Sequence, residues 1–285
     1  MKFHQPHAQL YIPDDTPEPQ ALARTTHLAI AAHQDDIEIM AIDGILEAFG
    51  QPDKWFTGVV MTNGAGSPRA GVYGDYTDEQ MRQVRIDEQK KAAFVGQYAA
   101  QFLLDYPSVQ VKDPAATEPV EDLIAILRAT KPDIVYTHNP ADKHNTHIGV
   151  IYKTLAAIRA LPRAERPRRL YGCEVWRDLD WMLDEDKVAF DVSRYENMQM
   201  ALVAVFDSQI SGGKRYDLAT MGRRRANATY YASHATDMAD LMTFAMDLTP
   251  LIEDDALDMI DYVMGYIDRF ARDVRGRLAS MAPSH

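Results

Sequence analysis

Two short stretches of the 285-residue sequence hold imidazole and carboxylate groups at close spacing. The first contains His33, Asp35 and Asp36, and the second contains His144 and His147. Imidazole and carboxylate are the usual ligands of a catalytic Zn²⁺, which takes three protein ligands and keeps one position for water. His33 and Asp36 flank a predicted strand-to-helix turn, so both side chains can point at one spot. Asp35 and His144 would then remain for proton transfer.

Each stretch also has an ordinary structural interpretation. Adjacent aspartates before a helix often act as N-caps, which stabilise a helix by about 1 kcal/mol. A single histidine at a strand end is commonly a hydrogen-bonded structural residue, and two histidines three residues apart recur by chance. The catalytic interpretation is favoured because both stretches are predicted at strand ends of one sheet.

Apolar runs alternate with helical patterns between residues 27 and 161. Strands are predicted at 27–32, 56–61, 102–104 and 133–137, and helices at 37–49, 77–95, 120–129 and 147–161. This alternation predicts an α/β fold, with a Rossmann-like, mostly parallel sheet and helices on both faces in three α/β/α layers. Ligands bind such sheets at the carboxyl ends of the strands, where both histidine-containing stretches fall.

The flanking regions are less regular. Residues 1–25 hold four of the 15 prolines and are expected to form an N-terminal arm, lying on the body or on a neighbouring subunit. Residues 26–285 are expected to form a single domain with a helical C-terminal extension. Its later part has predicted strands at 170–175 and 188–192, and predicted helices at 196–206, 214–232 and across most of 238–277.

Composition narrows the class of protein. The chain is 46% hydrophobic and 25% charged, which is typical of a globular protein. Its net charge of −12 argues against binding to nucleic acids and to anionic membranes. The single cysteine, Cys173, excludes an internal disulfide. The start of the chain lacks the apolar core of a signal peptide, and no apolar run approaches the roughly 20 residues of a membrane span. We therefore expect a cytoplasmic protein.

Four motifs, in the same order along residues 26–210, resemble the PIG-L/LmbE-like zinc-dependent N-acetylglucosaminyl deacetylase family. The family's A-H-P-D-D-E corresponds to Ala-His-Gln-Asp-Asp-Ile at 32–37, and its D-x-H-x-D-H to Asp-Lys-His-Asn-Thr-His at 142–147. Its T-x-G, R-x-x-E-x-x-x-A and S-Q motifs are matched at 62–64, 85–92 and 208–209. The chain departs from the first motif at Gln34 and Ile37.

The resemblance implies a hydrolase that removes acetyl from an N-acetylated amino sugar or its conjugate with one Zn²⁺ per subunit. Other divalent cations accept the same ligands. It implies His33, Asp36 and His147 as metal ligands. It also implies Asp35 as the general base, with His144 as the general acid and oxyanion partner.

The same resemblance assigns further residues. Arg85, Asn63 and Gly64 would contact the substrate, Arg85 alternatively supporting the site. Asp142 would orient a ligand from outside the coordination shell. Thr146 stands where many relatives have an aspartate that orients the acid histidine, so a weaker acid is expected.

Several alternatives stay open at this stage. The aromatic residues Trp176, Trp181 and Tyr171 would suit a sugar-stacking wall, although core packing is their more frequent role. The same scaffold could hydrolyse a non-sugar N-acyl substrate, or belong to a non-catalytic sugar-binding relative, or hold histidines that are only structural. A homo-oligomer, trimer or hexamer, is implied by the resemblance alone.

Overall fold

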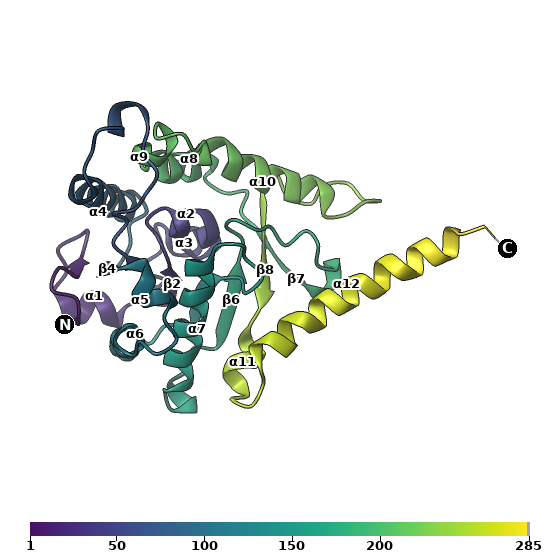
Figure 1. Ribbon diagram of the computed structural model, residues 1–285, viewed down its shortest axis with the longest axis horizontal. Coiled ribbons are helices and arrows are strands. Elements are labelled where there is room, and N and C mark those ends of the chain that lie inside the picture. Colours follow the sequence, from purple (N-terminus) through teal and green to yellow (C-terminus); the bar gives the residue numbers. More distant parts are fainter. Residues whose placement is uncertain (284–285) are drawn as a thin grey trace.

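A computed structural model describes residues 1–283 and shows one eight-stranded sheet flanked by helices (Figure 1). The strands are β1 (Gln9–Tyr11), β2 (His27–Ala31), β3 (Phe56–Thr62), β4 (Ala100–Tyr106), β5 (Ile134–His138), β6 (Arg169–Cys173), β7 (Lys187–Asp191) and β8 (Met242–Asp247). Their order across the sheet is β1-β4-β3-β2-β5-β6-β8-β7. The central strands β4, β3, β2, β5 and β6 pair in parallel, and the remaining pairs are antiparallel. The mostly parallel sheet predicted from the sequence is confirmed.

Helices cover both faces of this sheet. They are α1 (Glu18–Ala23), α2 (Asp36–Met40), α3 (Ile42–Ala48), α4 (Asp78–Val95), α5 (Ser108–Lys112), α6 (Glu118–Thr130), α7 (Asn145–Arg159), α8 (Glu196–Ala204), α9 (Asp207–Ile210), α10 (Tyr216–Tyr230), α11 (Thr249–Glu253) and α12 (Met259–Met281). One buried apolar cluster joins α6, α7 and α11 to the sheet, and a second joins α2, α3, α4 and α8 to it. Three layers therefore form, as predicted.

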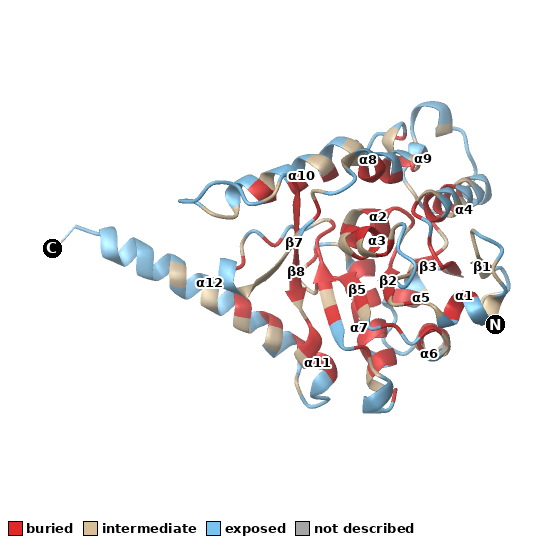
Figure 2. Cartoon of the chain, turned by 180° about the vertical axis from the view of Figure 1, so that it is seen from behind, coloured by how far each residue is buried: buried red, intermediate tan, exposed pale blue. Residues whose placement is uncertain are grey.

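The central strands are buried on both faces. Every residue of β2 and β3 is buried, and Figure 2 shows that the centre of the molecule is mostly buried. This pattern is typical of parallel strands covered by helices on each side, which read as unbroken apolar runs.

The chain order places a crevice beside β2. β2 pairs with β3 on one side and with β5 on the other, so the chain leaves β2 toward one edge and returns at β5 toward the opposite edge. Such a reversal opens a crevice at the carboxyl ends of the two strands, where doubly wound sheets bind ligands. The residues that follow β2 and β5 are those of the two histidine-containing stretches.

Residues 1–25 lie on the body of the protein. β1 pairs antiparallel with β4, and the N-terminal α1 contacts α6. The division of the chain into an N-terminal arm and a single domain from residue 26 stays a prediction. Within residues 1–283 no helix, the long α12 included, has the apolar character that crossing a bilayer requires.

The structure corrects two predicted helices. The pattern at 37–49 is two helices, because the backbone breaks at Ala41 between α2 and α3. The prediction of helix across most of 238–277 was wrong at its start, where β8 adds a strand to the sheet. The β8 sequence Met-Thr-Phe-Ala-Met-Asp is buried over its first five residues, and a short apolar run of this kind does not distinguish a strand from a buried helix.

Candidate metal centre

Four elements position the residues that the sequence singled out. His33 follows β2 and Asp36 is the first residue of α2. His144 is the N-cap of α7, and His147 lies in its first turn. Arg85 comes from the middle of α4. The carboxyl ends of β2 and β5 thus bring together side chains that are distant in the sequence.

Three of these side chains present ligand atoms at nearly equal spacing. His33 Nδ1 lies 3.2 Å from Asp36 Oδ2, His147 Nε2 lies 3.4 Å from the same oxygen, and the two histidine nitrogens are 3.3 Å apart. In a tetrahedral zinc site with bonds of about 2.0–2.2 Å, ligand atoms lie roughly 3.3–3.6 Å from one another. The donor set and its spacing therefore fit a zinc-sized cation.

Asp36 is held ionised by its neighbours. Burial alone would raise its pKa, but His147 and His138 hold the pKa of this carboxyl well below its ordinary value. Its Oδ2 also accepts a 2.8 Å hydrogen bond from the backbone N–H of His33. An ionised carboxylate beside two imidazoles is the charge state that a cation site requires.

His138 lies beside this group, with its Nε2 3.5 Å from Asp36 Oδ2, and it forms a second possible metal-binding group with Asp142 and His147. Its ring stacks on that of His147, with centroids 3.8 Å apart, and its Nε2 accepts a 2.8 Å hydrogen bond from the backbone N–H of Ala32. The lone pair that a metal would need is therefore already used. His138 acts as a structural histidine that ties the end of β2 to β5.

Asp142 supports His147 from behind. Its Oδ2 lies 3.4 Å from His147 Nδ1 and accepts a hydrogen bond from the backbone N–H of Trp176, and its Oδ1 accepts one from that of His144. The opposite ring nitrogen of His147 faces Asp36. A carboxylate on the far side of a ligating histidine fixes the orientation of the ring, which is the position expected for Asp142.

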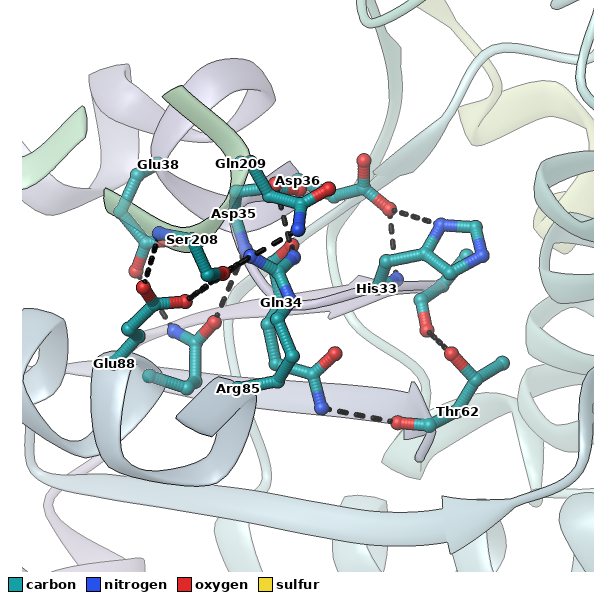
Figure 3. A network of polar contacts seen from close by, with 12 residues as sticks. His33, Gln34, Asp35, Asp36, Glu38, Thr62, Arg85, Glu88, Ser208 and Gln209 are labelled. Carbon is teal, nitrogen blue, oxygen red and sulfur yellow. Dashed lines mark hydrogen bonds and ion pairs between the residues drawn. The ribbon is translucent and has the colours of Figure 1, made fainter. Parts of the chain in front are cut away.

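Asp35 lies next to His33, Asp36 and His147, and its backbone has a strained conformation. Its φ angle is +85°, a value that non-glycine residues rarely adopt and that clusters at functional sites. The side chain is buried, and Arg85 Nη2 donates a 2.9 Å hydrogen bond to Asp35 Oδ2 (Figure 3). Burial raises the pKa of Asp35 to about 6, against the lowering effect of Arg85.

Arg85 is the centre of a buried polar network (Figure 3). Its guanidinium also donates to the backbone oxygen of Gln34 and, at 3.3 Å, to Glu88 Oε2. Glu88 in turn accepts 2.7 Å hydrogen bonds from the backbone N–H and the hydroxyl of Ser208. These protein partners give Arg85 a supporting role, and its predicted contact with substrate stays a prediction.

The Thr62–Gly64 segment approaches this network closely. Gly64 has φ +69°, and a Cβ at this position would lie 2.5 Å from Gln34 Oε1 and 3.1 Å from Arg85 Cβ. Only glycine fits such a turn. Asn63 is anchored by its own backbone N–H, which donates to the carbonyl of Tyr106.

His144 lies near the same group of side chains. Its hydrogen-bond partner is not the carboxylate that would be expected to orient an acid histidine. Its Nδ1 accepts a 3.3 Å hydrogen bond from the backbone N–H of Thr146, so a neutral ring carries its proton on Nε2. Burial, with help from His147 and His33, lowers the pKa of His144 to about 4. The hydrogen-bond donor of the neutral ring is therefore its Nε2–H.

A cavity of about 340 Å³ connects these groups. The sequence-predicted residues in its wall are His33, Asp35, Asp36, Asn63, Gly64, Arg85 and His144, whereas His147 and Asp142 lie behind it. Of the three aromatic candidates Trp176 lines the cavity. Trp181 packs on Phe270, and Tyr171 packs on Tyr136 and Phe190.

The sequence did not point to every residue of the wall. Ser108, Lys112, Lys214 and Tyr216 also line the cavity. Ser108 and Lys112 belong to α5, a five-residue helix too short to give a periodic signal. Lys214 lies 5.1 Å from the centre of the Trp176 ring, a contact that only the folded chain creates.

Comparison with known proteins agrees with this architecture. Residues 28–158 match the family model PIG-L, described as GlcNAc-PI de-N-acetylase. No curated protein matches the chain. The resemblance to the PIG-L family stated from the motifs is therefore confirmed over residues 28–158.

Several solved structures share the fold at low sequence identity. N,N'-diacetylchitobiose deacetylase from Pyrococcus horikoshii is 16% identical with a TM-score of 0.62, and the match covers 87% of this chain and 92% of that one. The A40926 pseudoaglycone deacetylase is 16% identical, with a TM-score of 0.57 and coverage of 79% and 97%. The 4-carboxy-2-hydroxymuconate hydratase GalB from Pseudomonas putida KT2440 is 17% identical, with a TM-score of 0.61 and coverage of 79% and 95%. At these identities the likeness concerns the fold, which supports more than one reaction.

Proposed function

We propose that the protein is a metal-dependent N-deacetylase that removes acetyl from an N-acetylated amino sugar or its conjugate. The observation that carries this proposal is the spacing of 3.2–3.4 Å among the ligand atoms of His33, Asp36 and His147. His33 and Asp36 line a cavity whose wall also contains Asp35. A cation held there would supply Lewis acidity and lower the pKa of a bound water toward neutrality.

The chain's own residues supply the remaining steps. Asp35 Oδ2 is engaged by Arg85, while Oδ1 has no hydrogen-bond partner within residues 1–283 and is available to accept a proton from the attacking water. His144 lines the cavity, and its Nε2–H would donate a hydrogen bond to the carbonyl oxygen as negative charge develops there, which is one of the two roles expected of it. As the C–N bond breaks, Asp35 would pass the proton taken from the water to the leaving amine. Arg85 keeps Asp35 in place through the same hydrogen bond.

The substrate class has two lines of support. The cavity of about 340 Å³ falls in the range of small-molecule sites, and Trp176 offers a flat apolar surface of the kind on which sugar rings stack. The matched family is described as a de-N-acetylase of a GlcNAc compound, and one of the similar structures is a diacetylchitobiose deacetylase. An N-acetylglucosamine conjugate is therefore the substrate we propose.

The test is acetate release by zinc-loaded protein from N-acetylglucosamine, N,N'-diacetylchitobiose and an N-acetylated alkylamine, with and without a chelator. We expect chelator-sensitive release from the sugars at a kcat/KM well above that for the alkylamine. Preference for the alkylamine would favour a non-sugar amidohydrolase. Sugar binding without acetate release from any compound would contradict the proposed reaction and favour a non-catalytic relative.

Two further sequence predictions stay proposals here. These are the cytoplasmic location and the assembly into a trimer or hexamer. Cell fractionation and solution mass measurements test them separately from the reaction.

A further inference from the structure

The C-terminal helix α12 carries a long apolar stripe that faces away from the body. Its residues follow a 4-3 repeat over three heptads: Ile260, Met264, Ile267, Ala271, Val274, Leu278 and Met281. All seven are exposed, with Ile260 at 62%, Leu278 at 69% and Met281 at 85%. Such a repeat is the pattern with which one helix packs along another.

The stripe is distinct from the face that α12 uses to contact its own chain. The body-facing residues Met259, Val263 and Tyr266 are buried, Phe270 packs against Trp181, and Arg269 forms an ion pair with Asp186. Beyond these contacts the helix projects away from the rest of the molecule (Figures 1 and 2). Its 23 residues span about 34 Å at 1.5 Å per residue. An apolar face of this length in water is stabilised by packing against a partner.

The charges of α12 indicate which partner packs against its apolar stripe. The first half of the helix holds Asp261, Asp268 and Arg269, and its second half holds Arg272, Asp273, Arg275 and Arg277. The ion pairs of α12 within residues 1–283 are Arg269–Asp186 and Arg277–Asp273, which leaves Asp268 and Arg275 without a partner there. A helix that is acidic toward one end and basic toward the other is complementary to an antiparallel copy of itself.

We propose that α12 pairs with α12 of a second copy of this chain as an antiparallel two-helix coiled coil. Its two-fold axis would pass between residues 272 and 273. The apolar pairs would then be Ala271 with Val274, Ile267 with Leu278 and Met264 with Met281, each formed twice. In the same register Asp268 of one copy faces Arg275 of the other.

A parallel pair lacks this complementarity. In that arrangement Asp268 would face Val263, and Arg275 would face Phe270, so neither charge meets an opposite one. The acidic halves would lie side by side, as would the basic halves. The net charge of −12 also disfavours an anionic membrane surface as the occupant of the stripe.

Cysteine cross-linking distinguishes these arrangements in the full-length protein. In the antiparallel pair residue 278 faces residue 267 of the other copy, and neither residue faces itself. We therefore expect Ile267→Cys/Leu278→Cys to form a covalent dimer under mild oxidation, and Ile267→Cys alone and Leu278→Cys alone to form none. The native Cys173 is 1% exposed and provides no competing thiol.

Charge exchange gives an independent measurement by sedimentation equilibrium. Asp268→Arg or Arg275→Asp alone would place like charges together twice and weaken dimer formation at least ~10-fold. The double variant Asp268→Arg/Arg275→Asp restores both pairs and should associate within about threefold of the unaltered protein. The unaltered protein should sediment as a dimer or a multiple of one, which is compatible with the hexamer proposed above and not with the trimer.

Each contrary result overturns the proposal. Cross-linking by Ile267→Cys alone and by Leu278→Cys alone would show a parallel pair. Cross-linking by none of the three cysteine variants would show that α12 does not join two copies, whatever the mass of the assembly. A monomer at all concentrations, or an oligomer unaffected by the charge reversals, would have the same consequence.

Discussion

The Nε2 atom of His147 lies 3.3 Å from the Nδ1 atom of His33, although 114 residues separate the two histidines. They meet because β2 and β5 are adjacent parallel strands whose carboxyl ends lie at the same edge of the sheet. Asp36 completes the group from the first turn of α2. The proposed metal centre is thus a direct product of the sheet order.

Replacement of Asp35 by asparagine tests the proposed general base. Asparagine tolerates the positive φ of this position, so the backbone should be preserved. We expect metal content to be unchanged and the rate of acetate release to fall at least ~100-fold, because the carboxylate that accepts a proton is lost. The exposed Asp53→Asn variant should keep full activity. Full activity in Asp35→Asn would remove this residue as the base.

Replacement of Arg85 by methionine tests the buried network. The carboxylates of Asp35 and Glu88 would be left buried without their cation, and we expect a loss of about 3–5 kcal/mol in the free energy of unfolding in urea. Arg85→Lys should show an intermediate loss, because it keeps the charge without the fork of donors. Arg215→Met, at an exposed ion pair with Asp217, is the control and should have a much smaller effect. Equal effects of Arg85→Met and Arg215→Met would contradict the supporting role.

Gly64 and Gly66 offer a matched pair of substitutions in one loop. Gly64→Ala introduces a Cβ against Gln34 and Arg85 at a positive φ, so we expect a destabilisation of about 1–3 kcal/mol together with weaker catalysis. Gly66→Ala meets no atom within 4 Å and should be nearly neutral. Urea unfolding and acetate release measure both effects. Indistinguishable variants would show that the close approach at Gly64 is unimportant.

The buried His27, which is not part of the proposed metal centre, should make the free energy of unfolding depend on pH. Burial, with a contribution from Lys54, lowers its pKa to about 4. The unfolded chain, with a histidine pKa near 6.5, therefore binds more protons below that pH than the folded chain does. The contribution of His27 to the free energy of unfolding is fully present above pH 6.5 and is lost as the pH falls toward 4.

Unfolding in urea at pH 7 and pH 5 measures this effect. Between the two pH values the unaltered protein should lose about 2 kcal/mol more stability than His27→Gln. The difference isolates His27 from the other titrating groups, since those are common to both proteins. An equal loss in the two proteins would show that His27 does not titrate with a lowered pKa.

Much of the fold could be predicted because its elements carry local signals. The helix predicted at 77–95 is one example, since Thr77 begins α4 with a capping box to Gln80 and Gly96 ends it, and both are local start and stop signals. β8 could not be predicted in this way, because its apolar run has no clear period and its pairing with β6 and β7 joins distant parts of the chain. β1 is a three-residue edge strand whose pairing with β4 likewise depends on the folded body.

The candidate site could likewise be predicted only where the signal is local in the sequence. The proposed ligand set is inferred from motifs that are contiguous in the sequence, through their resemblance to a known family, and the structure brings His33, Asp36 and His147 together. Which residues would support them depends on contacts that no spacing reveals. The hydrogen bond from Ala32 to His138 and the burial of Glu88 against Ser208 are examples, since each joins segments more than 100 residues apart.

Zinc content after dialysis of the purified protein tests the central claim most directly. We predict one tightly bound Zn²⁺ per chain in the unaltered protein and in the exposed-histidine control His234→Ala, measured by elemental analysis. His33→Ala, Asp36→Asn and His147→Ala should each retain less than about one tenth of that metal, because three protein ligands are needed to hold it. Absence of zinc binding by the unaltered protein, or unchanged binding by these three variants, would contradict a metal centre at this position.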